Sequence, residues 1–123
     1  MIKKLEQVFK ALSDRNRLRI VHMLCRKPLC VCEITYILQL SQSTVSGHLR
    51  VLKNADLVED HKDGLWVEYS LNRQNGWIND ITDIINIQAK EDSLMENDLR
   101  MLEKADRKEI LCKTPNQNGK SQN

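Results

Sequence analysis

Apolar residues recur at intervals of three and four along most of the chain, a spacing that predicts amphipathic helices. The first helix covers residues 2–12. A second helix follows Asp14 as its N-cap and ends before Pro28. A short third helix is expected over residues 31–38. A longer fourth helix is expected over residues 42–54, because a serine that can serve as its N-cap stands directly before it.

The pattern changes from helical to extended after residue 55. Residues 57–61 and 65–71 read as two strands, and the intervening residues 62–64 contain Asp-Gly, a dipeptide that tolerates the positive φ of a tight hairpin. Helical spacing returns at Trp77 and continues, with more polar residues, toward Leu111. The expected fold class is mainly α with a small β-hairpin and an extended C-terminal helical segment.

The chain has 123 residues, a length that suits one compact domain. We expect that domain over residues 1–112 and a disordered tail over residues 113–123, which are rich in Asn, Gln and Lys. No stretch resembles a secretion signal or a membrane span, so the protein is expected to be soluble and cytoplasmic, without a membrane partner. The four cysteines are then expected to be reduced thiols.

Two short helices joined by a tight turn and followed by a hairpin are the parts of a winged helix-turn-helix, whose second helix enters the major groove of DNA. In the fourth helix, Val45, Leu49 and Leu52 define the core side. The residues that point away from the core are polar or small: Ser43, Gly47, Arg50 and Asn54, flanked by Ser46 and Lys53. They suit base edges and phosphates. An ordinary solvated helix face is the alternative.

Charge adds modest support for a nucleic-acid partner. Residues 1–74 hold 12 Lys and Arg against 8 Asp and Glu, whereas the remainder holds 7 against 9. A basic excess of this size is also compatible with an ordinary soluble surface. No arrangement typical of nucleophilic or acid–base catalysis and no glycine-rich phosphate loop is evident, so an enzyme is not expected.

The chain resembles the ArsR/SmtB family of arsenic- and metal-responsive repressors. Four segments carry the resemblance, in order: FKALSDRNRLRIVHML, LCVCEI, LSQSTVSGHLRVLKNADLV and WVEYSLN. The resemblance implies a homodimer, built largely from the first and last helices, that binds a palindromic double-stranded operator and represses transcription. It also implies a set of DNA-reading residues in the fourth helix, with a hairpin residue on the DNA backbone: Ser43, Thr44, Ser46, His48, Arg50 and Lys62.

Cys30 and Cys32 lie at the start of the third helix, where helix amide groups favour a thiolate. Residues two apart do not share a face of a regular helix. Both sulfurs therefore bind one ion only if this first turn is open or distorts. The alternative is two small residues packed behind the fourth helix. LCVCEI resembles the inducer site of arsenic-responsive members, where the pair belongs to a three-thiolate site for As(III) or Sb(III), ions that soft ligands suit.

The sequence does not identify the third ligand of such a site. Thr35 stands where the arsenic-responsive pattern has its third cysteine. Cys112 completes the site only if its segment folds back or comes from the other subunit. Cys25 is more simply a packing residue. A small cellular thiol is the remaining option.

We therefore predict a repressor that releases its operator when Cys30 and Cys32 bind arsenite or antimonite. The alternatives are a cadmium- or lead-responsive repressor, a thiol redox or persulfide sensor of the same fold, and a dimeric interaction module with structural cysteines. Cadmium ranks second, because cadmium-responsive members add cysteines near the N-terminus and this chain has none before Cys25. Zinc and nickel sensing is disfavoured, because every histidine precedes the last helix.

Overall fold

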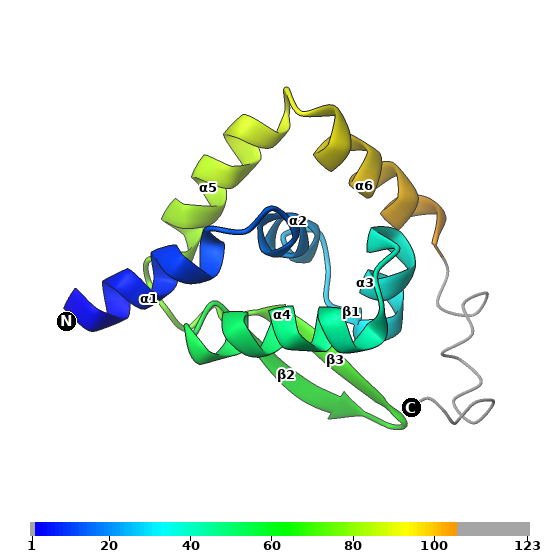
Figure 1. Ribbon diagram of the computed structural model, residues 1–123, viewed down its shortest axis with the longest axis horizontal. Coiled ribbons are helices and arrows are strands. Elements are labelled where there is room, and N and C mark those ends of the chain that lie inside the picture. Colours follow the sequence, from blue (N-terminus) through cyan, green and yellow to red (C-terminus); the bar gives the residue numbers. More distant parts are fainter. Residues whose placement is uncertain (1, 106–123) are drawn as a thin grey trace.

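The computed structural model describes residues 2–105, which form six helices and three strands (Figure 1). The elements in chain order are α1 (Ile2–Leu12), α2 (Arg15–Leu24), β1 (Leu29–Cys30), α3 (Val31–Leu38), α4 (Gln42–Asn54), β2 (Val58–Asp63), β3 (Trp66–Leu71), α5 (Ile78–Ala89) and α6 (Ser93–Lys104). The mainly helical fold class is confirmed. The predicted tail at 113–123 and the end of the predicted domain, with Cys112, lie outside the described residues.

The helices begin at the capping residues that the sequence indicates. Asp14 accepts hydrogen bonds from the amides of Asn16 and Arg17, at 2.8 and 3.1 Å, and so caps α2. Ser41 accepts one from the Thr44 amide at 3.2 Å and caps α4. Each cap satisfies amide groups that have no partner inside the helix. These local interactions fix where the two helices start.

A third strand joins the predicted hairpin. The sheet is antiparallel with the order β1-β3-β2, and Leu29 pairs with Tyr69 while Cys30 pairs with Glu68. The hairpin turn consists of two residues, 64 and 65, one residue later than the predicted turn at 62–64. Gly64 takes the first turn position with a φ of 65°, which a glycine adopts without strain.

The core forms around α2, which is seen nearly end-on at the centre of Figure 1. Its residues Ile20, Val21 and Met23 are fully buried, and the helix contacts α1, α4, α5, α6 and β3. The core side of α4 is as predicted, because Val45, Leu49 and Leu52 have no exposed surface. Helix α4 and strand β3 are therefore both packed on a central helix that also contacts α1, α5 and α6.

The C-terminal helical segment breaks after Ala89. Asp92 caps α6 by accepting the Met95 amide hydrogen at 2.9 Å, and α6 then packs against α2 and α3 (Figure 1). A buried ion pair holds α6 in this position: the Arg19 guanidinium donates to both carboxylate oxygens of Asp98 at 2.9 Å. The side chains of Arg19 and Asp98 are only 13% and 2% exposed.

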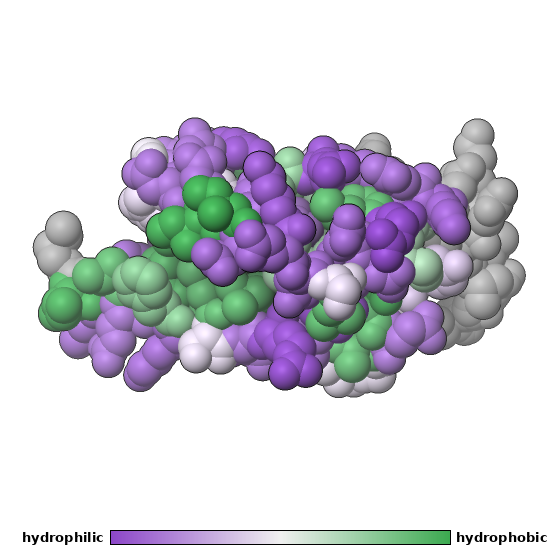
Figure 2. All heavy atoms as spheres, turned by 90° about the horizontal axis from the view of Figure 1, so that it is seen from above, coloured by the Kyte–Doolittle hydropathy of each residue, from purple (hydrophilic) through white to green (hydrophobic). Residues whose placement is uncertain are grey.

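Two helices leave apolar side chains exposed at one end of the molecule. We call this set the apolar face: Ile2, Leu5 and Phe9 of α1, and Ile84 and Ile87 of α5, each more than half exposed. Figure 2 shows green side chains gathered on the left, where α1 and α5 lie, whereas the half that carries α6 is mostly purple. Among residues 2–105 no helix is both long enough and apolar enough to span a bilayer.

Candidate nucleic-acid interface and cysteine pair

The outer face of α4 carries the predicted DNA-reading residues. Ser43, Thr44 and Arg50 are exposed, and Ser46 and His48 are half-buried. Nothing lies within 4 Å of the position that a Cβ at Gly47 would take, so this face is open to a close approach. The hydroxyl of Ser41 also donates to Thr44 Oγ1 at 2.9 Å, which orders the first turn of the helix. The structure thus gathers a guanidinium and three hydroxyl groups on one helix.

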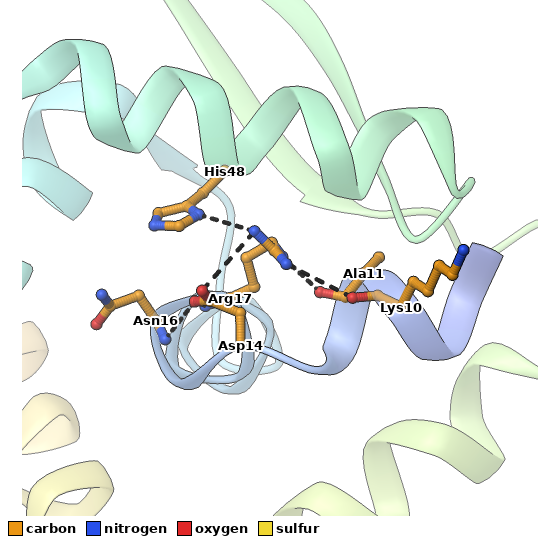
Figure 3. A network of polar contacts seen from close by, with 6 residues as sticks. All are labelled: Lys10, Ala11, Asp14, Asn16, Arg17 and His48. Carbon is orange, nitrogen blue, oxygen red and sulfur yellow. Dashed lines mark hydrogen bonds and ion pairs between the residues drawn. The ribbon is translucent and has the colours of Figure 1, made fainter. Parts of the chain in front are cut away.

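His48 is held by a neighbouring arginine, as Figure 3 shows. Nη1 of Arg17 lies 3.2 Å from Nδ1 of His48, and the same guanidinium donates to the carbonyl oxygen of Ala11 at 2.6 Å. Asp14 adds a longer ion pair with Arg17, at 3.9 Å. Since a guanidinium only donates hydrogen bonds, Nδ1 of His48 accepts one and the ring proton resides on Nε2. Arg17 therefore ties α1 and α2 to α4.

Sequence reasoning missed Arg17 because its contacts join residues far apart in the chain. The nearest sequence signal is its position three residues after the N-cap Asp14, a spacing at which helix side chains interact.

A second link joins α4 to the wing, the hairpin of β2 and β3. Nζ of Lys53 lies 3.0 Å from a carboxylate oxygen of Asp60, and this contact raises the pKa of Lys53. Burial, with Asp60 beside it, raises the pKa of the Tyr69 hydroxyl. Lys62 is exposed near the end of β2, where it can reach a DNA backbone. The pair of Lys53 and Asp60 is thus a contact between α4 and the wing, partly exposed and modest in strength.

The two candidate ligand sulfurs are adjacent. Sγ of Cys30 lies 2.9 Å from Sγ of Cys32. Cys30 is the N-cap of α3, with extended backbone angles (φ −87°, ψ 164°), and Cys32 lies in the first helical turn. The restriction on residues two apart in a regular helix does not apply, because Cys30 precedes the helix. The two sulfurs can therefore approach each other without distortion of the first turn of α3.

Cys30 also contributes to a helix cap and to the sheet. Its amide donates to the Glu33 carboxylate at 2.8 Å, which forms half of a capping box at the start of α3. Its backbone also lies opposite Glu68 in β3, the second strand of the wing. Cys30 therefore connects the sulfur pair, the N-terminus of α3 and the wing.

The other candidates for a third ligand are less well placed. Cys25 lines a separate cleft with Asn86, and burial raises the pKa of its thiol. No group of three His, Cys, Asp or Glu side chains suited to a metal occurs among residues 2–105. Thr35, one turn after Cys32, has a buried hydroxyl that bonds to no described residue. A hydroxyl is a poor ligand for a soft ion.

Two sulfurs in this arrangement fit one thiophilic ion. Thiolates bind a soft or borderline ion at about 2.3 Å, so two sulfurs that share it lie no more than about 4.6 Å apart. The pair of Cys30 and Cys32, at 2.9 Å, meets that upper limit. Angles of about 90 to 110° at the ion require about 3.3 to 3.8 Å, so the two sulfurs move slightly apart when they share it. Cys32 is disulfide-bonded in this structure, so shared ligation requires its reduction. Once reduced, the pair would supply two of the three thiolates that the arsenic-responsive pattern implies.

Comparisons with known proteins agree with this architecture. A family model described as "Bacterial regulatory protein, arsR family" matches residues 14–60. The chain is 42% identical over 73 residues to an arsenical resistance operon repressor of Bacillus subtilis, covering 58% of this chain and 70% of that protein. It is 52% identical over 62 residues to the cadmium resistance regulator CadC of Listeria innocua, covering 50% of this chain and 52% of that protein.

A solved structure shows the same fold. It is the homodimeric winged helix-turn-helix DNA-binding domain Mb0332 of Mycobacterium bovis, at 24% identity and a TM-score of 0.65, covering 73% of this chain and 82% of that one.

Proposed function

Because this chain belongs to the arsR family of bacterial regulatory proteins, we propose that it is a cytoplasmic, homodimeric repressor that binds operator DNA and is released by a thiophilic ion. The ion is trivalent arsenic or antimony, bound by Cys30 and Cys32. The observation that carries the proposal is the 2.9 Å separation of the two sulfurs at the start of α3.

DNA binding rests on α4 and the wing. Ser43, Thr44, Ser46 and Arg50 face the major groove, His48 lies at the side of the helix, and Lys62 contacts the DNA backbone. The support is the shared outward orientation of the α4 side chains and the absence of a large apolar residue among them. The contacts of Arg17 with His48 and of Lys53 with Asp60 join α4 to α2 and to the wing.

The coupling between the ion and DNA follows from the position of Cys30. Ion capture acts on the N-terminus of α3, which packs against α4, and on β1, which pairs with β3. Both DNA-contacting elements are thus adjacent to the ligand residues. A coupling free energy of about 1 to 3 kcal/mol between two sites changes affinity roughly 5- to 150-fold.

Cys112 is our candidate for the third ligand. α6 returns the chain to α3, the helix that carries Cys32, and its last residues pack there. Six residues lie between Ala105 and Cys112, so the chain from one to the other extends at most about 25 Å. This reach supports ligation by Cys112 of the same subunit, with a small cellular thiol as the alternative.

An arsenite titration tests the proposal directly. The operator is a sequence that the protein selects from a random DNA pool, and fluorescence anisotropy follows its release in the presence of a reductant. We expect arsenite and antimonite to weaken operator binding roughly 5- to 150-fold. Release by cadmium alone instead favours the cadmium-responsive alternative, which the 52% identity to CadC supports. Release by peroxide or polysulfide alone favours a thiol redox sensor.

Replacing Arg50 with alanine tests the recognition face. We expect operator affinity to fall roughly 5- to 150-fold, because one arginine that binds a base edge contributes about 1 to 3 kcal/mol. Arg100→Ala is the matched control, since Arg100 is exposed on α6, away from α4. Equal losses for the two variants would show that α4 does not read DNA.

The apolar face is the proposed dimer interface. Its α1 and α5 residues are exposed. The resemblance stated above assigns dimer contacts to the first and last helices, so it supports α1 directly, whereas the last helix, α6, contributes no residue to this face. The neighbour from Mycobacterium bovis is itself described as homodimeric.

We expect Phe9→Glu together with Ile84→Glu to give a folded monomer in light scattering, because buried charge without a partner disfavours association. Leu65→Glu in the wing should leave the dimer intact, although Leu65 is 78% exposed. A wild-type monomer at micromolar concentration would contradict the interface.

A further inference from the structure

A cleft of about 410 Å³ lies between α2, α5 and α6, apart from the cysteine pair and from α4. Small-molecule sites are commonly of this size, and helical folds often place them between helices. Its lining includes His22, Cys25, Asn86, Lys90, Glu96 and Leu99. None of these residues has a role in the function proposed above.

Two titratable groups in the cleft are uncharged near neutral pH. His22 is 5% exposed, and its Nδ1 is buried without a hydrogen-bond partner among the described residues. Burial lowers the pKa of His22, and Arg26 adds to this effect while Asp98 and Asp92 oppose it. Burial raises the pKa of the Cys25 thiol. Nδ1 of the imidazole has no partner among the described residues, but it is itself enclosed and is not exposed to a ligand in the cleft.

The residues that line the cleft carry an excess of one positive charge, and Asp92 and Asp98 act on His22 from outside this lining. Arg26 and Lys90 carry positive charges and Glu96 carries one negative charge. Arg26 also lies 3.5 Å from Glu103, in an exposed ion pair of the kind that contributes little. Ala89 and Leu99 form an apolar part of the wall of the cleft.

We propose that this cleft is a binding site for a small organic acid, a carboxylate on a short apolar body. The carboxylate lies at Lys90 and Arg26, and the apolar body lies against Ala89 and Leu99. A bound acid contacts α2, α5 and α6 together, so it stabilises the packing of the two C-terminal helices on the central helix. The proposal stands independently of DNA binding.

The experiment uses the full chain and benzoate as the probe. Benzoate is titrated into ¹⁵N-labelled protein, and amide shifts are compared with those caused by benzylamine and benzyl alcohol, which have the same ring but are cationic and neutral. We expect saturable shifts at the cleft residues for benzoate and markedly weaker binding of the other two. Equal binding of benzylamine, or shifts confined to the apolar face, would overturn the proposal.

Two lysines of α5 and α6 provide a matched pair of variants. Lys90→Ala removes a charge beside the cleft, whereas Lys104→Ala removes one at the end of α6; both lysines are exposed, so both variants should fold. We expect Lys90→Ala to weaken benzoate binding roughly fivefold, the effect of one exposed ion pair, and Lys104→Ala to leave it unchanged. Leu99→Trp, which fills the cleft, should reduce binding further. Identical constants for all three variants and the wild type would refute the site.

Discussion

The protein with both Cys30→Ser and Cys32→Ser is expected to bind its operator normally and to show no release by arsenite. Serine has nearly the shape of cysteine and is a better N-cap, so the start of α3 is preserved. Its hydroxyl does not provide the soft thiolate that arsenite requires. The full release, roughly 5- to 150-fold in the wild type, should therefore disappear. Operator anisotropy with increasing arsenite measures it.

Variants with one cysteine replaced identify which cysteines are ligands. Cys25→Ser should respond to arsenite like the wild type, because Cys25 lines a different cleft. Cys112→Ser should weaken the response if Cys112 is the third ligand and leave it unchanged if a small thiol takes that place. Release that persists when Cys30 and Cys32 are both serine would rule out this inducer site.

The second large effect concerns stability. Asp98→Ala is expected to lower the free energy of unfolding by about 3 to 5 kcal/mol, because it leaves the Arg19 guanidinium buried without its partner. The hydrogen bonds that Arg19 donates to Asp98 raise the pKa of Arg19. Arg19 therefore stays charged near neutral pH, and deprotonation does not relieve the cost of burying it. Urea denaturation at several protein concentrations measures the change and separates it from dimer dissociation.

Two further variants identify the cause. Glu103→Ala breaks the exposed pair with Arg26 and should cost at most about 1 kcal/mol. Arg19→Met together with Asp98→Leu removes both charges and should recover most of the stability lost in Asp98→Ala. Equal effects of Asp98→Ala and Glu103→Ala would show that the buried pair does not anchor α6.

The sequence predicts the helix-turn-helix closely because local signals define it. Asp14 and Ser41 mark the starts of α2 and α4, and the core stripe of α4 fixes which side faces outward. The break between α5 and α6 was not predicted, although Asp92, which caps α6, is a local signal of the same kind. These features depend on residues within a few positions of one another, which pattern reasoning detects.

The features that sequence reasoning missed depend on long-range pairing. β1 has two residues, too few for an alternating pattern, and it exists because Leu29 and Cys30 pair with β3 about 40 residues later. The contact of Arg17 with His48 likewise joins positions 31 residues apart. The adjacency of the two sulfurs was left conditional, because it depends on whether Cys30 lies inside the helix or before it.

The contact between Arg17 and His48 also limits what His48 can recognise. With Nδ1 occupied, the ring presents a single hydrogen, on Nε2, and no lone pair to the groove. A group of this kind matches the acceptor atoms of guanine, the N7 of adenine, the O4 of thymine or a phosphate oxygen, and it is mismatched with the amino group of cytosine. If α4 reads DNA as proposed, Arg17 thereby limits which DNA edges this histidine can contact.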